Sequence, residues 1–175
     1  MCSMNHNILS WNVRGLNEGR KRLKNRNLLS KWKVDIACLQ ETKLKLISTQ
    51  LVQSLWRCPY KEWCYVASNG ASGGILLMWD HRVVSKIDEC MGRFVVACSF
   101  RNVEDGLVWA FAEVYGPNSN SCRRSMWEEL AGLMSIWDMP WCIGGDFNAT
   151  IFHSERSGRA GMRRAATEFV DFIVD

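Results

Sequence analysis

Short apolar runs recur along the chain, each bounded by glycine or polar residues. Runs of this length and setting are typical of buried β-strands. The predicted strands are residues 7–13, 34–39, 64–67, 74–79, 83–87, 94–100, 107–114 and 141–143. A glycine- and serine-rich turn at 68–73 separates the third strand from the fourth.

Apolar residues spaced three or four positions apart predict helices between some of these strands. The first helix covers about 19–33, and its inner side is formed by Leu23, Leu28, Leu29 and Trp32. Three further helices are predicted around 47–55, over 121–137 with a cap near Ser121, and over 163–174. Strand–helix alternation at both ends, around a run of consecutive strands, predicts an α/β fold with two packed sheets and helices outside.

Length and composition fit one folded domain over residues 1–175. Hydrophobic residues make up 47% of the chain, and it has nine tryptophans, so intrinsic disorder is excluded as its class. No apolar run approaches the roughly 18 residues of a membrane span, and no basic-then-apolar leader opens the sequence. We expect a nuclear or cytoplasmic protein that contacts no membrane.

The net charge of +4 is a mild basic excess, which permits an anionic partner without requiring one. Basic residues gather in two segments, 14–26 and 156–164. Taken alone, such a segment is more often a solvated helix face or loop than a binding site. Both segments lie beside the polar motifs described next, and this position favours contact with phosphate groups.

Eight cysteines are spread along the chain without a Cys-x-x-Cys pair or a neighbouring histidine pair. The spacing therefore gives no zinc motif. Several cysteines, including Cys38 and Cys142, sit inside apolar runs. Buried reduced thiols explain this better than a disulfide framework does, and they indicate a reducing compartment.

Polar residues follow four of the predicted strands where an apolar strand needs none: Asn12, Glu41, Tyr115, and Asp146 with Asn148. Strand ends commonly present chemistry, because the backbone there is rigid while the side chains reach solvent. Carboxylates from separate strands can hold a hard cation such as Mg²⁺, or Mn²⁺ in its place. Amide and phenol groups can donate to a phosphate oxygen. Each motif alone is more often turn or capping chemistry, but four in succession favour a site.

These motifs resemble a known group of enzymes. The segments 11–17 (WNVRGLN), 40–43 (QETK), 114–118 (VYGPN) and 145–149 (GDFNA) are similar to those of the endonuclease/exonuclease/phosphatase superfamily. Within it, the chain most resembles the apurinic-endonuclease-like domain of plant non-LTR (LINE-type) retrotransposons, which 73–79 and 154–158 also resemble. The resemblance implies a four-layer α/β/β/α sandwich of the deoxyribonuclease type.

The resemblance also implies roles for single residues. Glu41 would be the principal ligand of a magnesium ion, with Asn12 and Asp146 beside it. Asp146 would also position the attacking water, Tyr115 would face the scissile phosphate, and Asn148 would stabilise the transition state. The DNA backbone would be contacted by Arg14, Lys43, Asn118, Arg156 and Arg159.

One departure from the superfamily pattern concerns histidine. Its members carry a late Ser-Asp-His motif, and no such motif follows Asp146 here. Asp80-His81 comes too early and is better explained as a turn, and neither His6 nor His153 is expected to take the role. We therefore expect a sandwich that lacks its C-terminal strands, and catalysis weakened on the order of 10² to 10⁴-fold or lost.

The leading hypothesis is a Mg²⁺-dependent DNA endonuclease domain of retrotransposon type, a monomer or part of a polyprotein with a reverse transcriptase. In an intact relative it would nick one DNA strand and leave a 3′-hydroxyl for primed reverse transcription. One alternative is a DNA-binding remnant without catalysis. Another is an enzyme of the same fold that hydrolyses small phosphate esters.

Overall fold

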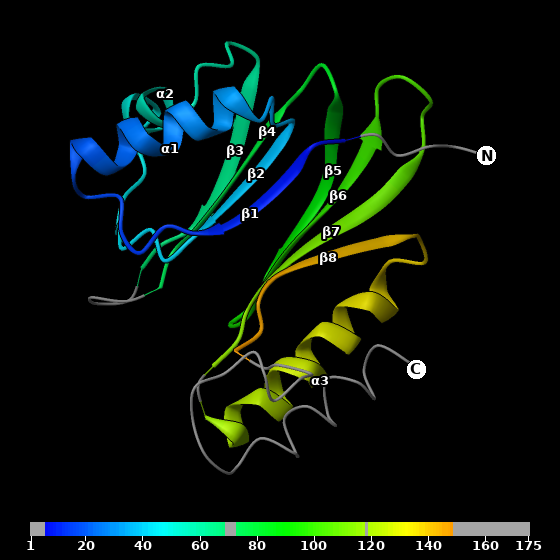
Figure 1. Cartoon of the computed structure of the whole chain (residues 1–175). Coiled ribbons are helices and arrows are strands. Elements are labelled where there is room, and N and C mark those ends of the chain that lie inside the picture. Colours follow the sequence, from blue (N-terminus) through cyan, green and yellow to red (C-terminus); the bar gives the residue numbers. More distant parts are fainter. Residues whose placement is uncertain (1–5, 69–72, 118, 149–175) are drawn as a thin grey trace, which may run out of the picture.

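The computed structural model describes residues 6–68, 73–117 and 119–148. Over these residues two four-stranded sheets face each other, with helices on their outer sides (Figure 1). The first sheet has the order β1 (Ile8–Asn12), β2 (Ile36–Gln40), β4 (Ile75–Asp80) and β3 (Lys61–Val66). The second has the order β5 (Val84–Met91), β6 (Val95–Asn102), β7 (Val108–Tyr115) and β8 (Trp141–Asp146).

Helices α1 (Gly19–Lys31) and α2 (Thr49–Leu55) cover the first sheet, and α3 (Asn120–Ile136) covers the second (Figure 1). Because both faces of each sheet are covered, the central strands are buried and mostly apolar. On β2, Ala37 and Leu39 pack toward the helices, whereas Ile36 and Cys38 pack toward the other sheet. The predicted α/β/β/α sandwich of the deoxyribonuclease type is confirmed.

Two parallel strand pairs decide where the polar strand ends lie. Strand β1 runs parallel to β2, so Asn12 is level with Gln40. Strand β7 runs parallel to β8, so Tyr115 is level with Asp146. The other strand pairs are antiparallel. Strands β1 and β8 lie at neighbouring margins of the two sheets (Figure 1), which brings the two parallel pairs together.

All eight predicted strands are present, with boundaries shifted by a few residues. The largest shift is in β5, which continues to Met91 instead of ending at 87, and β8 continues to Asp146 instead of ending at 143. Helix α3 begins at Asn120 after the cap residue Ser119, earlier than the predicted cap near Ser121. The helix predicted over 163–174 lies outside the described residues.

The prediction for the inner side of α1 is wrong for Leu23 and Trp32, and Leu28 lines a groove on the outer face of the helix. Leu29 is buried, but Leu23 is 46% exposed and Trp32 is 41% exposed. Trp32 follows the last helical residue and its ring lies 5.8 Å from that of Trp11. Of the α1 residues, only Leu29 joins the buried cluster that also holds Val13, Leu16 and Val34.

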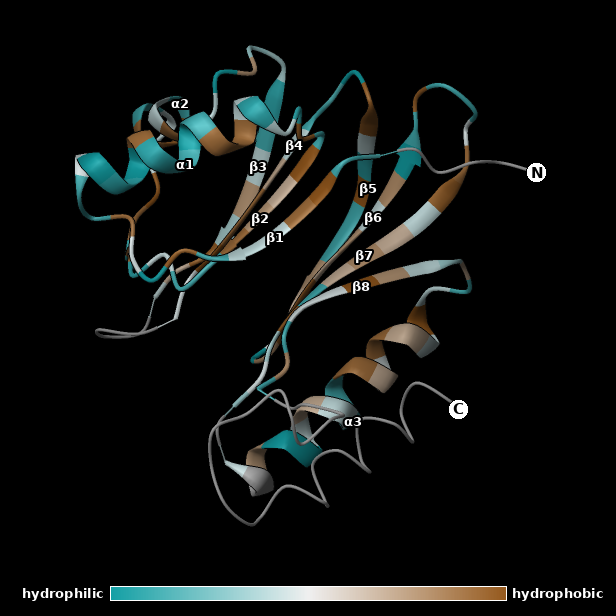
Figure 2. Ribbon diagram, viewed as in Figure 1, coloured by the Kyte–Doolittle hydropathy of each residue, from teal (hydrophilic) through white to brown (hydrophobic). Residues whose placement is uncertain are grey.

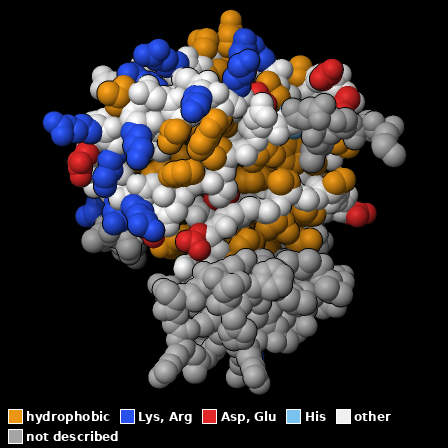
Figure 3. All heavy atoms as spheres, viewed as in Figure 1, with side chains coloured by type: hydrophobic (Ala, Val, Ile, Leu, Met, Phe, Trp, Pro, Cys, Tyr) orange, Lys and Arg blue, Asp and Glu red, His pale blue; other side chains and the backbone are white. Residues whose placement is uncertain are grey.

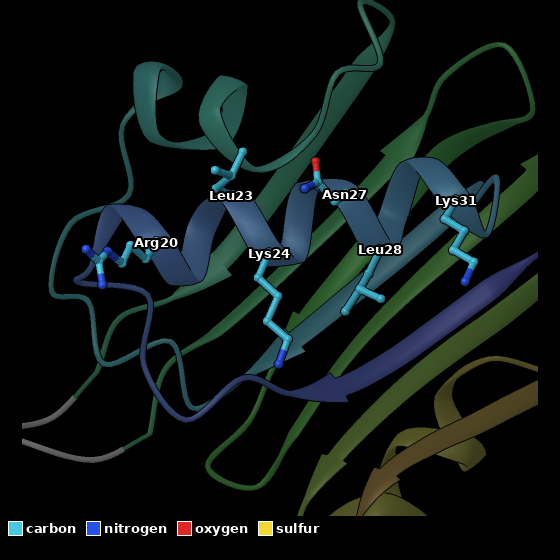
Figure 4. A pocket seen from close by; sticks show the side chains of 6 residues that line it. All are labelled: Arg20, Leu23, Lys24, Asn27, Leu28 and Lys31. Atoms are coloured by element: carbon cyan, nitrogen blue, oxygen red, sulfur yellow. The ribbon is translucent and has the colours of Figure 1, made fainter.

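The outer face of α1 carries a shallow groove of about 370 Å³. Figure 4 shows its lining side chains, which are Arg20, Leu23, Lys24, Asn27, Leu28 and Lys31. In Figure 2 this helix is largely hydrophilic, in contrast to the apolar strands beneath it. In the described part of the chain, no helix has both the length and the apolar character that a membrane crossing requires.

A buried carboxyl group lies between the sheets. Glu113 on β7 is fully buried, and the Ser10 hydroxyl on β1 donates to its Oε1 over 2.6 Å. Burial raises the pKa of Glu113 to about 8, although hydrogen bonds from Ser10 and Cys38 oppose the shift. Glu113 therefore stays protonated at neutral pH, because a charge between two apolar sheets would be poorly solvated.

This carboxyl group should make stability depend on pH. Between its ordinary pKa of 4.5 and its folded pKa of about 8, the folded state holds a proton that the unfolded state has lost. Its contribution is complete below 4.5 and is lost as the pH rises through about 8. In urea denaturation at a series of pH values, Glu113→Gln should flatten this decline. Glu128→Gln, at an exposed site on α3, should leave the decline unchanged; an equal slope in all three proteins would contradict the assignment.

Candidate active site

The loops after β1 and β2 are joined by backbone hydrogen bonds beyond the last paired strand residues. The amide of Gly15 donates to the Glu41 carbonyl over 2.7 Å, and the amide of Leu16 donates to the Thr42 carbonyl over 2.9 Å. The pairing that sets Asn12 beside Gln40 is thereby extended into the loops. Asn12 and Glu41 consequently project from one continuous edge.

Left-handed backbone conformations gather at this edge. Arg14, Glu41, Lys43 and Asn148 have φ values of 51°, 52°, 57° and 48°. Among described residues other than glycine, only Lys33 shares this conformation. Side chains with a Cβ adopt it at a cost, and such strain clusters at functional sites. The four positions coincide with residues that the sequence selected for metal, phosphate or DNA contact.

Glu41 is held by hydrogen bonds from both sheets. The Tyr115 hydroxyl on β7 donates to Glu41 Oε1 over 2.9 Å. Partial burial alone would raise the pKa of Glu41, but hydrogen bonds from Asn12 and Tyr115 outweigh it and lower the pKa. The positive charges of Lys43 and Arg14 add to the lowering. Glu41 is thus a carboxylate at neutral pH, the form that a metal ligand requires.

The two sheets are tied together directly behind this carboxylate. Gln40, the last residue of β2, is buried, and its Nε2 donates to the Val114 carbonyl on β7 over 2.7 Å. Gln40 precedes Glu41 and Val114 precedes Tyr115, so this bond lies one residue inside the contact between Glu41 and Tyr115. Sequence inspection gave Gln40 no role, because its partner lies 74 positions away.

The loop after β8 is fixed against the end of β7. Asp146 Oδ1 accepts from the Asn148 amide over 3.1 Å, and Asn148 Nδ2 donates to the Gly116 carbonyl over 2.6 Å. A Cβ at position 116 would overlap the backbone of Phe147, so only glycine allows this approach. Arg123 on α3, which sequence inspection missed, donates to the Asn148 carbonyl over 2.8 Å.

Tyr115 connects the two halves of the edge. Burial, the hydrogen bond to Glu41, and the negative charges of Glu41 and Asp146 raise the pKa of Tyr115 to about 12. The phenol therefore keeps its proton and remains a hydrogen-bond donor at neutral pH. Since Tyr115 is also level with Asp146 in the parallel pair, one side chain faces both carboxylates.

The donor set at this edge suits a hard divalent cation. Asn12, Glu41 and Asp146 offer amide and carboxylate oxygens, the ligands that Mg²⁺ prefers. Two carboxylates at neighbouring strand ends would repel a phosphate group placed between them, although the positive charges of Arg14 and Lys43 offset part of this repulsion. A bound cation would remove this repulsion. The individual roles assigned to these residues stay predictions.

The basic residues predicted to contact DNA are only partly described. Arg14 and Lys43 lie close enough to Glu41 to lower its pKa, so they border the site. Figure 3 shows lysine and arginine side chains gathered on the α1 side of the molecule. Asn118, Arg156 and Arg159 lie outside the described residues.

Neither described histidine belongs to this edge. His6 precedes β1, where its Nε2 lies 2.8 Å from Asn102 Oδ1 and its ring stacks on Trp109. His81 follows β4, whose antiparallel register puts this end level with the start of β2. Asp80 is occupied by an ion pair with Arg82 at 2.6 Å. Both histidines therefore lie at the end of the sandwich away from Glu41, and His153 lies outside the described residues.

Comparison with known proteins identifies one matching family and several similar solved structures. The model of the Endonuclease/Exonuclease/phosphatase family matches residues 9–173. The AP endonuclease LMAP from Leishmania major is similar in structure, with a TM-score of 0.72 and 16% identity over 97% of this chain and 66% of that one. The 3′ phosphatase NExo from Neisseria was solved with a product DNA hairpin. Its TM-score is 0.68, with 17% sequence identity over 95% of this chain and 70% of that one.

The human Nocturnin catalytic domain gives a TM-score of 0.61 and 19% identity over 82% of this chain. The chain spans 64% of the Nocturnin domain and 66% of the Leishmania protein, just under two thirds of each. At these identities the likeness establishes the fold alone. A search of curated proteins found no similar sequence.

The bond between Gln40 and Val114 can be tested by Gln40→Met, which keeps the length of the side chain and removes the donor. Loss of this buried hydrogen bond should lower the free energy of unfolding by roughly 0.5–1.5 kcal/mol in urea. If the bond also positions Tyr115 against Glu41, the Tyr115 pKa should fall from about 12 toward its ordinary 10. NMR of labelled tyrosine would follow this pKa. Gln53→Met, at an exposed position on α2, should change neither quantity.

Proposed function

This chain belongs to the endonuclease/exonuclease/phosphatase family, and on that premise we propose that it is a Mg²⁺-dependent DNA endonuclease domain of retrotransposon type. The fold is that of a family of phosphoester hydrolases. The observation that carries the proposal is the hydrogen bond from Tyr115 to Glu41. It joins the two sheets at the edge where Asn12 and Asp146 also end their strands.

In this proposal Glu41 is the principal ligand of Mg²⁺, and Asn12 and Asp146 complete the set. When bound, the ion would offset negative charge on the scissile phosphate and on the departing oxygen. Asp146, whose Oδ1 is fixed by the Asn148 amide, orients the attacking water and accepts its proton. Tyr115 keeps its proton at neutral pH, and its hydroxyl would turn from Glu41 to a phosphate oxygen once Glu41 holds the ion.

The choice of DNA as substrate rests on charge, sequence and relatives. Arg14 and Lys43 border the carboxylates and can neutralise phosphates on either side of the cleaved bond. Asn118, Arg156 and Arg159 are proposed as further backbone contacts. The Leishmania relative is named an AP endonuclease, and the Neisseria 3′ phosphatase was solved with a product DNA hairpin. The retrotransposon type, with a reverse transcriptase in the same polyprotein, rests on the sequence motifs quoted above.

A second candidate function is hydrolysis of small phosphate esters. A mannosyl-6-phosphatase from Bacteroides thetaiotaomicron has a TM-score of 0.62 and 15% identity over 84% of this chain. The same oxygen ligands would serve either substrate. Release of phosphate from sugar phosphates, with DNA left intact, would favour this alternative.

Nicking of supercoiled plasmid tests the main proposal. Slow turnover is expected because neither described histidine lies at the site, so the protein is used in molar excess over plasmid. Nicking should require Mg²⁺ or Mn²⁺. Glu41→Gln and Asp146→Asn should each lower the rate by at least about 10²-fold. Glu104→Gln, an exposed change between β6 and β7, is the matched control and should retain the rate.

Metal-independent nicking, or equal rates in all variants, would refute the assignment of these carboxylates. Plasmid binding without any nicking would instead identify the DNA-binding remnant. Calorimetric titration with Mg²⁺ separates the endonuclease from the remnant. The endonuclease should bind the ion through Glu41, so Glu41→Gln should weaken its Mg²⁺ affinity, whereas the remnant need not bind the ion in this way.

DNA affinity tests the basic border of the site. The double change Arg14→Ala with Lys43→Ala should weaken binding uniformly across sequences, since phosphate contacts carry no base information. The slope of log affinity against log salt should become shallower by about 2, close to 0.9 for each lost phosphate contact. Fluorescence anisotropy at several salt concentrations measures both. Arg101→Ala, at the opposite end of the sandwich, is the control; an unchanged slope in the double variant would exclude these contacts.

A further inference from the structure

A group of three potential metal ligands lies where the two sheets meet at the margin formed by β3 and β5. Cys64 comes from β3, Glu89 from β5 and Cys98 from β6. One ligand atom from each residue lies within 4.8 Å of the other two. These residues share nothing with the candidate active site, which is built on β1, β2, β7 and β8.

The distance between the thiols fits coordination to one ion. Cys64 Sγ and Cys98 Sγ are 3.7 Å apart. Two thiolates at about 2.3 Å from a tetrahedral zinc ion are separated by roughly 3.8 Å, so they need not move to share it. A disulfide requires about 2.05 Å, which is shorter than the separation of the two sulfur atoms here.

Glu89 supplies the third ligand, and its position is set by the sheet. In the antiparallel register of β5 and β6, Glu89 lies directly opposite Cys98. Lys86 is bonded to Glu89 Oε2, so Oε1 can bind an ion while Lys86 holds the carboxylate in place. Partners of this kind orient metal ligands in many proteins.

We propose that Cys64, Cys98 and Glu89 form a binding site for zinc or another thiophilic divalent cation, which would link the first sheet to the second. Sulfur ligands select such ions over Mg²⁺. The fourth coordination position would be open to water on the Glu89 side, since Glu89 is exposed and Cys98 is fully buried.

Charge balance supports a divalent cation. With both thiols protonated, Lys86 and Glu89 form a neutral pair. A divalent ion that displaces the two thiol protons leaves the net charge of the cluster unchanged, so no uncompensated charge enters the sheet interface. The hydrogen bond with Cys64 and burial raise the pKa of Cys98, so the ion must compete with a tightly held proton.

Spectroscopic titration of the full chain with Co²⁺, kept reduced by a phosphine, tests the site. We expect about one ion for each chain, thiolate-to-cobalt charge-transfer absorption, and d–d bands of tetrahedral intensity. Replacement of Co²⁺ by Zn²⁺ should abolish these absorption bands. Zinc binding in weak buffer should liberate about two protons. Cys64→Ser and Glu89→Gln change partly exposed side chains, and each should weaken the affinity by at least about 100-fold.

Cys90→Ser is the matched control, because Cys90 lies next to Glu89 on β5 and packs instead against the core beneath α3. It should retain the full affinity. Thermal melting of each variant without metal separates loss of ligand from loss of fold. An absence of stoichiometric binding in the folded, reduced protein would overturn the proposal. Coordinated thiolates should be protected from oxidation. A Cys64–Cys98 disulfide that forms at the same rate with and without zinc under mild oxidation would therefore also overturn the proposal.

Discussion

The geometry of the candidate active site depends on one buried hydrogen bond between the sheets. Gln40, the last residue of β2, donates to the carbonyl of Val114, the residue before the end of β7, and its buried amide would be costly to leave unpaired. Sheets that pack only through apolar side chains can slide, because dispersion contacts have little directional preference. A directional bond fixes their relative position at one point. That point lies one residue before Glu41 and Tyr115, so the two side chains meet at a defined distance.

Differences in solvation give two carboxyl groups of the molecule opposite protonation states at neutral pH. Glu113 lies between the sheets, where burial outweighs its hydrogen bonds and keeps the carboxyl protonated. Glu41 lies at the strand ends, where donors and nearby positive charges outweigh partial burial and keep it ionised. The two residues are on facing sheets of the same core. Distance from solvent, together with the number of donors, decides which of them can serve a cation.

The strand ends could be found from the sequence because each follows a short apolar run that predicts a buried strand. Asn12, Glu41, Tyr115 and Asp146 all lie where that pattern predicts, and the parallel registers bring them to one edge. Arg123 and Gln40 could not be found this way. Their partners are distant in the chain, and a polar residue in a helix or at the end of a strand carries no local signal of a distant bond. The error at Leu23 and Trp32 has a related cause, since helical spacing gives the apolar positions but not the width of the space that receives them.

The sequence alone determined the strands, most of the helices and the sandwich class, because these depend on local spacing and on apolar runs that must be buried. It also selected the polar residues at the strand ends. Only the tertiary structure decided which of these residues touch. Tyr115 meets Glu41 across 74 positions, and Cys64 meets Cys98 from the opposite sheet. Spacing along a chain reports neighbours within one element, whereas contacts between two packed sheets follow from the register and the angle of the whole interface.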